Sequence, residues 1–171
     1  MCYTIEFFIM KRTLGLALLI TALMACTSNK NGKLLPKFSY TTLEGKAISS
    51  DDLKGGATVI CVWATWCGDC IREIPELNDL VDKYADNDKV HFLAFSDEDE
   101  STVKKSLNRF PFNFEHIVDS KEYSDKLKSG LTKHFPQVLV IDEDLNIVFD
   151  VTENKEKIYS VLDGHIQEIL K

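Results

Sequence analysis

Hydrophobic residues along the chain alternate between short continuous runs and segments with helical spacing. Two runs, 58–63 and 90–96, are apolar almost throughout and predict strands that are buried on both faces. Between them, over 68–84, apolar residues recur at spacings of three and four, which predicts a helix with one buried face. Pro75 lies inside this pattern and predicts a bend in the helix.

The same signals continue on both sides of this centre. Segments 38–43 and 46–48 flank Glu44-Gly45 and predict a hairpin, followed by a polar turn that contains a short helix. Further along, the pattern predicts helices over 101–109, 121–129 and 158–169, and strands over 114–118, 138–141 and 146–151. This alternation of strands and helices predicts an α/β sandwich with a mixed central sheet.

Composition narrows the class of protein. The chain has 171 residues and 44% apolar content, which is enough for one domain with a filled core. It carries 27 acidic and 20 basic side chains, a net charge of -7. We exclude nucleic-acid binding, because phosphate recognition requires a basic surface.

The N-terminus has the charge pattern and length of a secretory signal. Met10-Lys11-Arg12 precedes the apolar segment 13–25, which is shorter than the spanning helix of about 20 residues that a bilayer requires. We therefore expect a signal peptide over 1–25 and export from the cytoplasm. Residues 1–9 precede a more natural start at Met10, which leaves their translation open.

Leu23-Met24-Ala25-Cys26 resembles a bacterial lipobox, in which cleavage leaves the cysteine as the lipidated first residue. We interpret the chain as a lipid anchor on Cys26, a polar tether over 26–33 and a folded domain over 34–171. Two alternatives stay open: an uncleaved anchor, or a signal cut elsewhere with Cys26 incidental. In each case we expect the domain on a bacterial membrane, on its periplasmic or cell-envelope side.

Trp66-Cys67-Gly68-Asp69-Cys70 carries the most specific chemistry of the chain. It follows a predicted strand and opens a predicted helix, which is the layout of a dithiol redox site. Unpaired N–H groups at a helix N-terminus stabilise one thiolate, and a thiol one turn further on resolves the mixed disulfide. Cys67 fits the attacking role and Cys70 the resolving role. Zinc is the alternative, but no second CxxC and no suitably spaced histidine pair completes four ligands, so we expect no metal.

These residues resemble the thioredoxin superfamily, and more closely its membrane-tethered TlpA/ResA-like thiol-disulfide oxidoreductases. The likeness spans 34–171 and is most specific at 62–70, at Glu73 and Pro75, and at Phe135-Pro136. It implies a thioredoxin-like sandwich with an N-terminal hairpin and an extra βα insertion that minimal thioredoxins lack.

The resemblance also implies roles for residues around the thiols. Pro136 would form a cis peptide bond, pack against the dithiol and prevent metal capture, while Phe135 would pair with an extended substrate segment. Glu73 would tune the active-site cysteines, and the alternative is an exposed first-turn acid. Trp63 and Trp66 would shape the apolar surround of the thiols, with plain core packing as the alternative for Trp63, and Trp66 would contact substrate.

Several neighbouring residues leave their roles open. Cys61 stands where thioredoxins carry a buried aspartate and is most simply a small buried hydrophobe. The family commonly has proline at the position of Asp69, which either disfavours the Cys67 thiolate or is a solvated first-turn charge. The acidic loop 96–100 either borders the redox site and favours basic partners, or is a solvated loop that caps the next helix. His134 is a weaker candidate for moving protons.

The sequence therefore predicts a lipid-anchored extracytoplasmic reductant of protein disulfides, whose only cofactor is the Cys67–Cys70 disulfide. The expected partners are disulfide-bearing proteins and a membrane electron donor, with no nucleic acid, and we expect a monomer. By resemblance, apocytochrome c is one expected substrate and misoxidised proteins are another. Two alternatives stay open: a thiol peroxidase, whose Pro-x-x-x-Thr-x-x-Cys pattern is missing before Cys67, and a redox-silent binding module.

Overall fold

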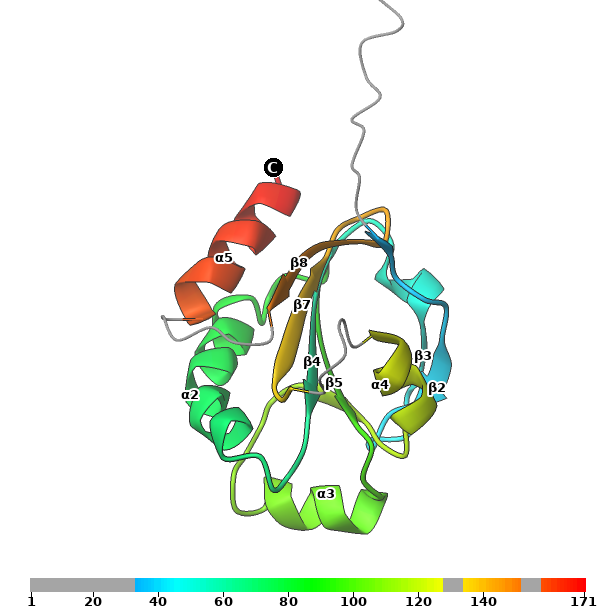
Figure 1. The fold of residues 1–171 in the computed structure, drawn as a ribbon. Helices are drawn as coiled ribbons and strands as arrows, with labels where there is room; N and C mark the ends of the chain where they lie inside the picture. The colour runs from blue at the N-terminus through cyan, green and yellow to red at the C-terminus, as the bar shows by residue number, and fades with distance from the viewer. Residues whose placement is uncertain (1–32, 128–133, 152–157) are drawn as a thin grey trace, which may run out of the picture. The chain divides into compact units, whose positions relative to one another are not determined.

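The central element of the protein is a mixed sheet, seen in a computed structural model that describes residues 33–127, 134–151 and 158–171 (Figure 1). Within these ranges the sheet has the strand order β1-β8-β7-β4-β5-β6. β4 pairs parallel with β5, and β5 with β6, whereas β7, β8 and β1 are added antiparallel. The strands are β1 (Lys33–Leu34), β4 (Ala57–Trp63), β5 (Val90–Ser96), β6 (Glu115–Ile117), β7 (Gln137–Ile141) and β8 (Asn146–Val151).

Helices and a hairpin cover the two faces of this sheet. Figure 1 shows α2 and α5 together on one face, and α4 with the hairpin of β2 and β3 on the other. These elements are β2 (Ser39–Thr41), β3 (Ala47–Ser49), the short 3-10 helix η1 (Ser50–Leu53), α2 (Gly68–Lys83), α3 (Glu100–Leu107), α4 (Lys121–Leu127) and α5 (Ile158–Ile169). The arrangement confirms the predicted α/β sandwich with its hairpin and its extra βα unit.

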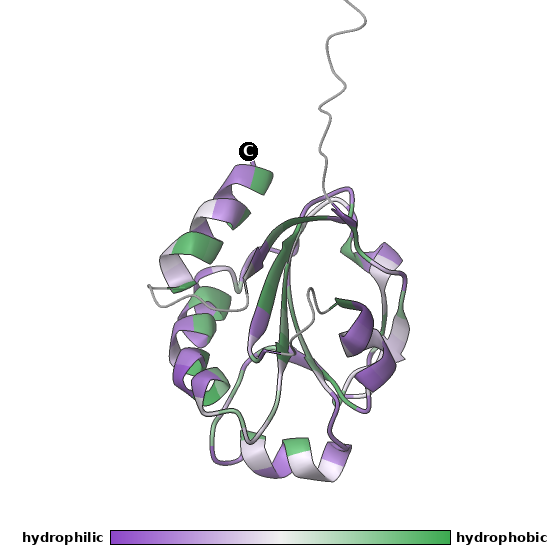
Figure 2. Cartoon of the chain, viewed as in Figure 1, coloured by the Kyte–Doolittle hydropathy of each residue, from purple (hydrophilic) through white to green (hydrophobic). Residues whose placement is uncertain are grey.

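Strand β4 contributes to both halves of the core. Because successive side chains point to opposite faces, Cys61 and Trp63 pack in the apolar cluster under α2 and α5, while Ile60 and Val62 pack in the cluster under α4 and the hairpin. All four are at most 1% exposed. Figure 2 shows the resulting pattern, with hydrophobic central strands and mixed helices. Burial on both faces explains why this strand is a continuous apolar run in the sequence.

Helices α2 and α5 pack through one apolar stripe each. The stripes include the buried residues Ile74, Leu77 and Leu80 of α2 and Ile158, Leu162 and Ile166 of α5, at spacings of three and four. Each such side chain stabilises the fold by about 1.5–3 kcal/mol through its burial. The helix that carries the thiols is therefore held against the sheet along its length.

Polar contacts add to the packing of these two helices. Lys83 Nζ and the Tyr84 hydroxyl both donate to the Asp163 carboxylate, at 2.6 and 2.8 Å. Pro75 is exposed and lies inside α2, which continues past it to Lys83. The bend expected at this proline stays a prediction.

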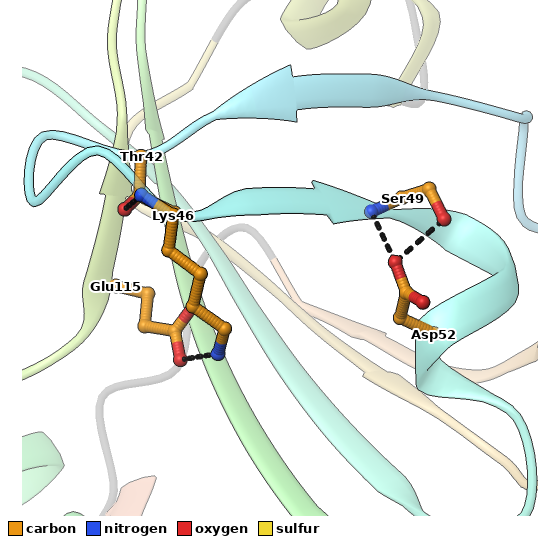
Figure 3. A network of polar contacts seen from close by, with 5 residues as sticks. All are labelled: Thr42, Lys46, Ser49, Asp52 and Glu115. Carbon is orange, nitrogen blue, oxygen red and sulfur yellow. Dashed lines mark hydrogen bonds and ion pairs between the residues drawn. The ribbon is translucent and has the colours of Figure 1, made fainter.

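The hairpin is closed by a glycine turn and fastened by polar contacts. Gly45 has a φ of +82°, a conformation that glycine adopts without steric cost. The Lys46 ammonium donates to the Glu115 carboxylate at 2.7 Å. Figure 3 shows this ion pair and the hydrogen bonds that the Ser49 N–H and hydroxyl donate to Asp52 of η1. These contacts connect the hairpin to β6 and to the next segment.

The structure differs from the sequence expectations mainly at the domain's beginning. β1 is absent from the predicted elements, because a two-residue strand carries no periodic signal. It pairs Lys33, the last residue of the predicted tether, with Ile147 of β8. The signal peptide, the lipidation site Cys26 and residues 26–32 of the tether lie outside the described residues.

Candidate active site

The two thiols lie where β4 ends and α2 begins. Cys67 is the N-cap of α2, and its Sγ accepts a hydrogen bond from the backbone N–H of Cys70, at 3.1 Å. The cysteines form a disulfide with a Cα–Cα distance of 5.3 Å. The helix N-terminus therefore directs unpaired N–H groups at Cys67, which stabilises a thiolate there once the disulfide is reduced.

An aromatic hollow borders the disulfide on the Cys67 side. Its volume is about 330 Å³, and its lining includes Trp66, Cys67, Asp69, His134 and Phe135. Trp66 is 71% exposed and meets the Phe135 ring edge to face, with 5.5 Å between centroids. An exposed aromatic residue beside a reactive sulfur provides an apolar contact surface for a substrate.

Pro136 follows this aromatic pair. The Phe135–Pro136 peptide bond is cis, which is the geometry that the family resemblance implies. The structure thus brings three of the residues singled out in the sequence, Trp66, Phe135 and Cys67, to one hollow. Trp63, by contrast, is buried and packs edge to face on Phe112 as part of the core.

Glu73 lies one turn beyond Cys70 and is half-buried. Its Oε2 is enclosed and has no hydrogen-bond partner among the described residues. Burial raises the pKa of Glu73 to about 7, although the nearby Arg72 guanidinium acts in the opposite direction. The carboxyl is therefore half-buried rather than fully exposed, and its role toward the cysteines stays a prediction.

Cys61 lies on the buried side of this region. Burial raises the pKa of the Cys61 thiol far above its usual range, and the negative charge of Glu73 adds to the effect. The thiol is free and 1% exposed, so it stays protonated. This agrees with the interpretation of Cys61 as a small buried hydrophobe, and it leaves Glu73 as the acid next to it.

Asp69 is mostly exposed to solvent. Its side chain is 63% exposed and forms an ion pair with Arg72. Water and salt screen an exposed ion pair of this kind. The contacts favour the second of the two interpretations, a solvated first-turn acid.

The acidic loop after β5 caps the next helix and also contacts the loop before Cys67, while its expected preference for basic partners stays a prediction. Asp99 is the N-cap of α3 and accepts from the backbone N–H of Thr102, at 2.9 Å, which explains why the helix begins at Glu100. Glu98 reaches Thr65 in the loop before Cys67. Sequence reasoning missed this second contact, although a polar residue after each of two parallel strands was a usable signal.

The described residues contain no cluster of metal-binding side chains and no membrane-spanning helix. Nowhere in them are three or more His, Cys, Asp or Glu side chains grouped as a metal site would require. None of the helices in the described ranges has both the length and the apolar character that crossing a bilayer requires.

A thioredoxin-like fold with a disulfide at the start of a helix defines a class of dithiol proteins. Residues 31–150 match the AhpC/TSA family, and the chain belongs to that family. Its relatives include the thiol-disulfide oxidoreductase ResA of Bacillus anthracis, which is 30% identical over 138 residues, covering 81% of this chain and 78% of the relative. The thioredoxin-like protein YneN of Bacillus subtilis (strain 168) is 27% identical over 139 residues, covering 78% and 79%.

Solved structures share the fold. A thiol:disulfide interchange protein of the thioredoxin family from Chlorobium tepidum TLS superposes with a TM-score of 0.69 at 24% identity, covering 84% of this chain and all of that one. The comparisons confirm the predicted thioredoxin-like fold, the ResA-like resemblance and the enzyme class, a thiol-disulfide oxidoreductase.

Proposed function

We propose that the protein is an extracytoplasmic reductant of protein disulfides that works through Cys67 and Cys70. The observation that carries this proposal is the disulfide at the N-terminus of α2, with Cys67 in the wall of an open hollow. Cys70 is 3% exposed and does not line that hollow, which suits a resolving thiol that reacts only after substrate has been captured.

The reaction moves two electrons and two protons to the substrate. The Cys67 thiolate attacks one sulfur of a substrate disulfide, that bond breaks, and the other substrate sulfur leaves and takes up a proton. Cys70 then loses its proton and attacks Cys67 Sγ, which expels the second substrate thiolate. That thiolate is protonated, and the Cys67–Cys70 bond is formed again.

Glu73 is the group that we propose to accept the proton of Cys70. It lies three residues beyond Cys70, one helical turn along, so that the two side chains share a face of α2. A carboxyl whose pKa is raised to about 7 binds and releases a proton readily at neutral pH. Cys61 supplies no acid of this kind, because its thiol stays protonated.

Trp66, Phe135 and Pro136 are the proposed substrate contacts. Trp66 and Phe135 meet beside Cys67, and their exposed apolar surface suits the side chains that flank a cysteine in an unfolded segment. Pro136 follows Phe135 through a cis peptide bond, and the backbone before it would pair with an extended substrate segment. Exposed cysteine pairs in unfolded proteins, such as apocytochrome c or misoxidised chains, form a suitable class of substrate.

The cellular setting in the proposal rests on the N-terminal segment. Residues 1–25 would direct export, Cys26 would carry the lipid, and the domain would work as a monomer at the outer face of a bacterial membrane. Regeneration of the dithiol would then require a thiol donor in the membrane, because glutathione and cytosolic thioredoxin are absent there. Replacement of Cys26 by alanine should release the protein from the membrane fraction, and unchanged membrane association would contradict the lipid anchor.

Trapping of substrates tests the central claim. Cys70→Ser should hold substrates as mixed disulfides on Cys67, whereas Cys67→Ser should trap none and should not reduce insulin. Trapping by both variants, or by neither, would contradict the assigned roles. Peroxide consumption that depends on Cys67, without insulin reduction, would instead favour the peroxidase, and failure in both assays would favour the redox-silent module.

A further inference from the structure

Glu98 and Thr65 occupy equivalent places at one edge of the sheet. Thr65 follows β4 by two residues, Glu98 follows β5 by two, and the parallel register pairs Trp63 with Ser96 at the ends of these strands. The loop that leads to Cys67 therefore lies beside the loop that leads to α3. Their meeting depends on the strand order, because the two residues are 33 positions apart in the chain.

The Glu98 carboxylate holds Thr65 at two points. The Thr65 backbone N–H donates to Oε2 and the Thr65 hydroxyl donates to Oε1, each at 2.7 Å. The Ser96 hydroxyl also donates to Oε2, at 3.3 Å, and accepts from the Glu98 N–H at 3.2 Å. The Asp119 N–H donates to the Glu98 carbonyl at 3.0 Å, which fixes the backbone of this residue. The contacts with Ser96 and Asp119 thus fix the orientation in which Glu98 binds Thr65.

Thr65 lies inside the turn that positions the attacking sulfur. The Cys67 N–H donates to the Ala64 carbonyl, at 3.1 Å, so that Thr65 lies in the middle of the turn. Cys67 ends this turn and caps α2, where its Sγ accepts from Cys70 N–H. Small displacements of the turn therefore move the sulfur relative to the N–H group that stabilises it.

We propose that Glu98 is a positioning residue for the redox turn: by holding Thr65 it keeps Cys67 Sγ at the N-terminus of α2, where the thiolate of the reduced enzyme is stabilised. The inference rests on the dithiol function proposed above. Glu98 acts through Thr65 and takes no part in the exchange of bonds itself.

The charge of Glu98 and its contacts with Thr65 have opposite effects on the pKa of the Cys67 thiol. A negative charge near Cys67 disfavours the thiolate, so removal of the charge alone should lower the pKa of the Cys67 thiol. Removal of the contacts should raise that pKa, because the sulfur loses its alignment with the helix N-terminus. Glu98→Gln separates the two effects, since an amide oxygen can accept from the Thr65 N–H while the amide nitrogen donates to the Thr65 hydroxyl.

The experiment measures the pH profile of iodoacetamide alkylation of Cys67, and the rate of insulin reduction, in the full-length reduced protein. Glu98→Ala should raise the pKa of the Cys67 thiol and slow insulin reduction by about tenfold. Glu98→Gln should keep the larger part of the rate with a thiol pKa at or below that of the wild type. Thr65→Val, which retains the N–H and loses the hydroxyl, should raise the thiol pKa less than Glu98→Ala. Glu100→Gln, a change at an exposed acid at the start of α3, is the control for loss of charge.

Two results would overturn the inference. If Glu98→Ala lowers the thiol pKa as Glu98→Gln does, the residue acts through its charge. If Glu98→Ala and Thr65→Val lower the free energy of unfolding but leave the Cys67 thiol pKa and the rate of insulin reduction unchanged, the contact has only a structural role. A wild-type protein that does not reduce insulin would count against the proposed function instead, and the alkylation profiles would still decide the role of Glu98.

Discussion

Replacement of Glu73 by glutamine should change how the stability of the protein depends on pH. The pKa of Glu73 is raised from 4.5 to about 7 in the folded protein, mainly by burial. Between these two values the folded state binds its proton more tightly than the unfolded state, so the free energy of unfolding falls as the pH rises. Glutamine carries no titrating proton, and the variant should lack this loss.

The expected magnitude follows from the two pKa values. A group that lost all contact with water would contribute about 3.4 kcal/mol over this range, at about 1.36 kcal/mol for each pKa unit. Because Glu73 is only half-buried, solvent screening reduces the figure to about 1–2 kcal/mol. Below the lower of the two pKa values, Glu73 is protonated and as neutral as the glutamine that replaces it. The free energies of unfolding of the wild type and the variant should therefore differ by a constant amount there.

Urea unfolding of the oxidised wild type and Glu73→Gln, from about pH 4.5 to about pH 8, measures this difference. The variant should gain about 1–2 kcal/mol relative to the wild type as the pH rises through this window. Asp79→Asn, a change at an exposed acid of the same helix, should show no such trend. A difference between Glu73→Gln and the wild type that stays constant across the window would refute the burial of this carboxyl, whatever its catalytic role.

Three further predictions concern packing and helix ends, with urea unfolding as the measurement. Gly56→Ala should cost about 2 kcal/mol or more, because the new Cβ would overlap the Lys89 carbonyl, whereas Gly164→Ala in an open helical position should gain about 0.5–1 kcal/mol. Equal effects at the two glycines would contradict the close approach. Leu80→Ala, at a fully buried position, should cost about 2–5 kcal/mol, and a loss below about 1 kcal/mol would show that α2 is not held by its apolar stripe. Asp99→Ala should cost about 1 kcal/mol through loss of the α3 cap, and no loss would contradict capping.

Local patterns explain why most elements could be predicted. The apolar run that became β4 and the spacing of Ile74, Leu77 and Leu80 in α2 each reflect burial within a few neighbouring residues. β5 and β8 agree with their predicted ranges for the same reason. β1 could not be found in this way, because its two residues gain their strand character only from pairing with β8.

The amino-acid sequence by itself determined the dithiol and its place at a helix start, because cysteines three positions apart after a buried strand need no distant partner to be recognised. Only the tertiary structure decided the surroundings of that dithiol. The strand order brings Glu98 to Thr65, and the fold brings Phe135 to Trp66 and buries one oxygen of Glu73. Such contacts join residues far apart in the chain, and long-range strand pairing rather than local periodicity selects them.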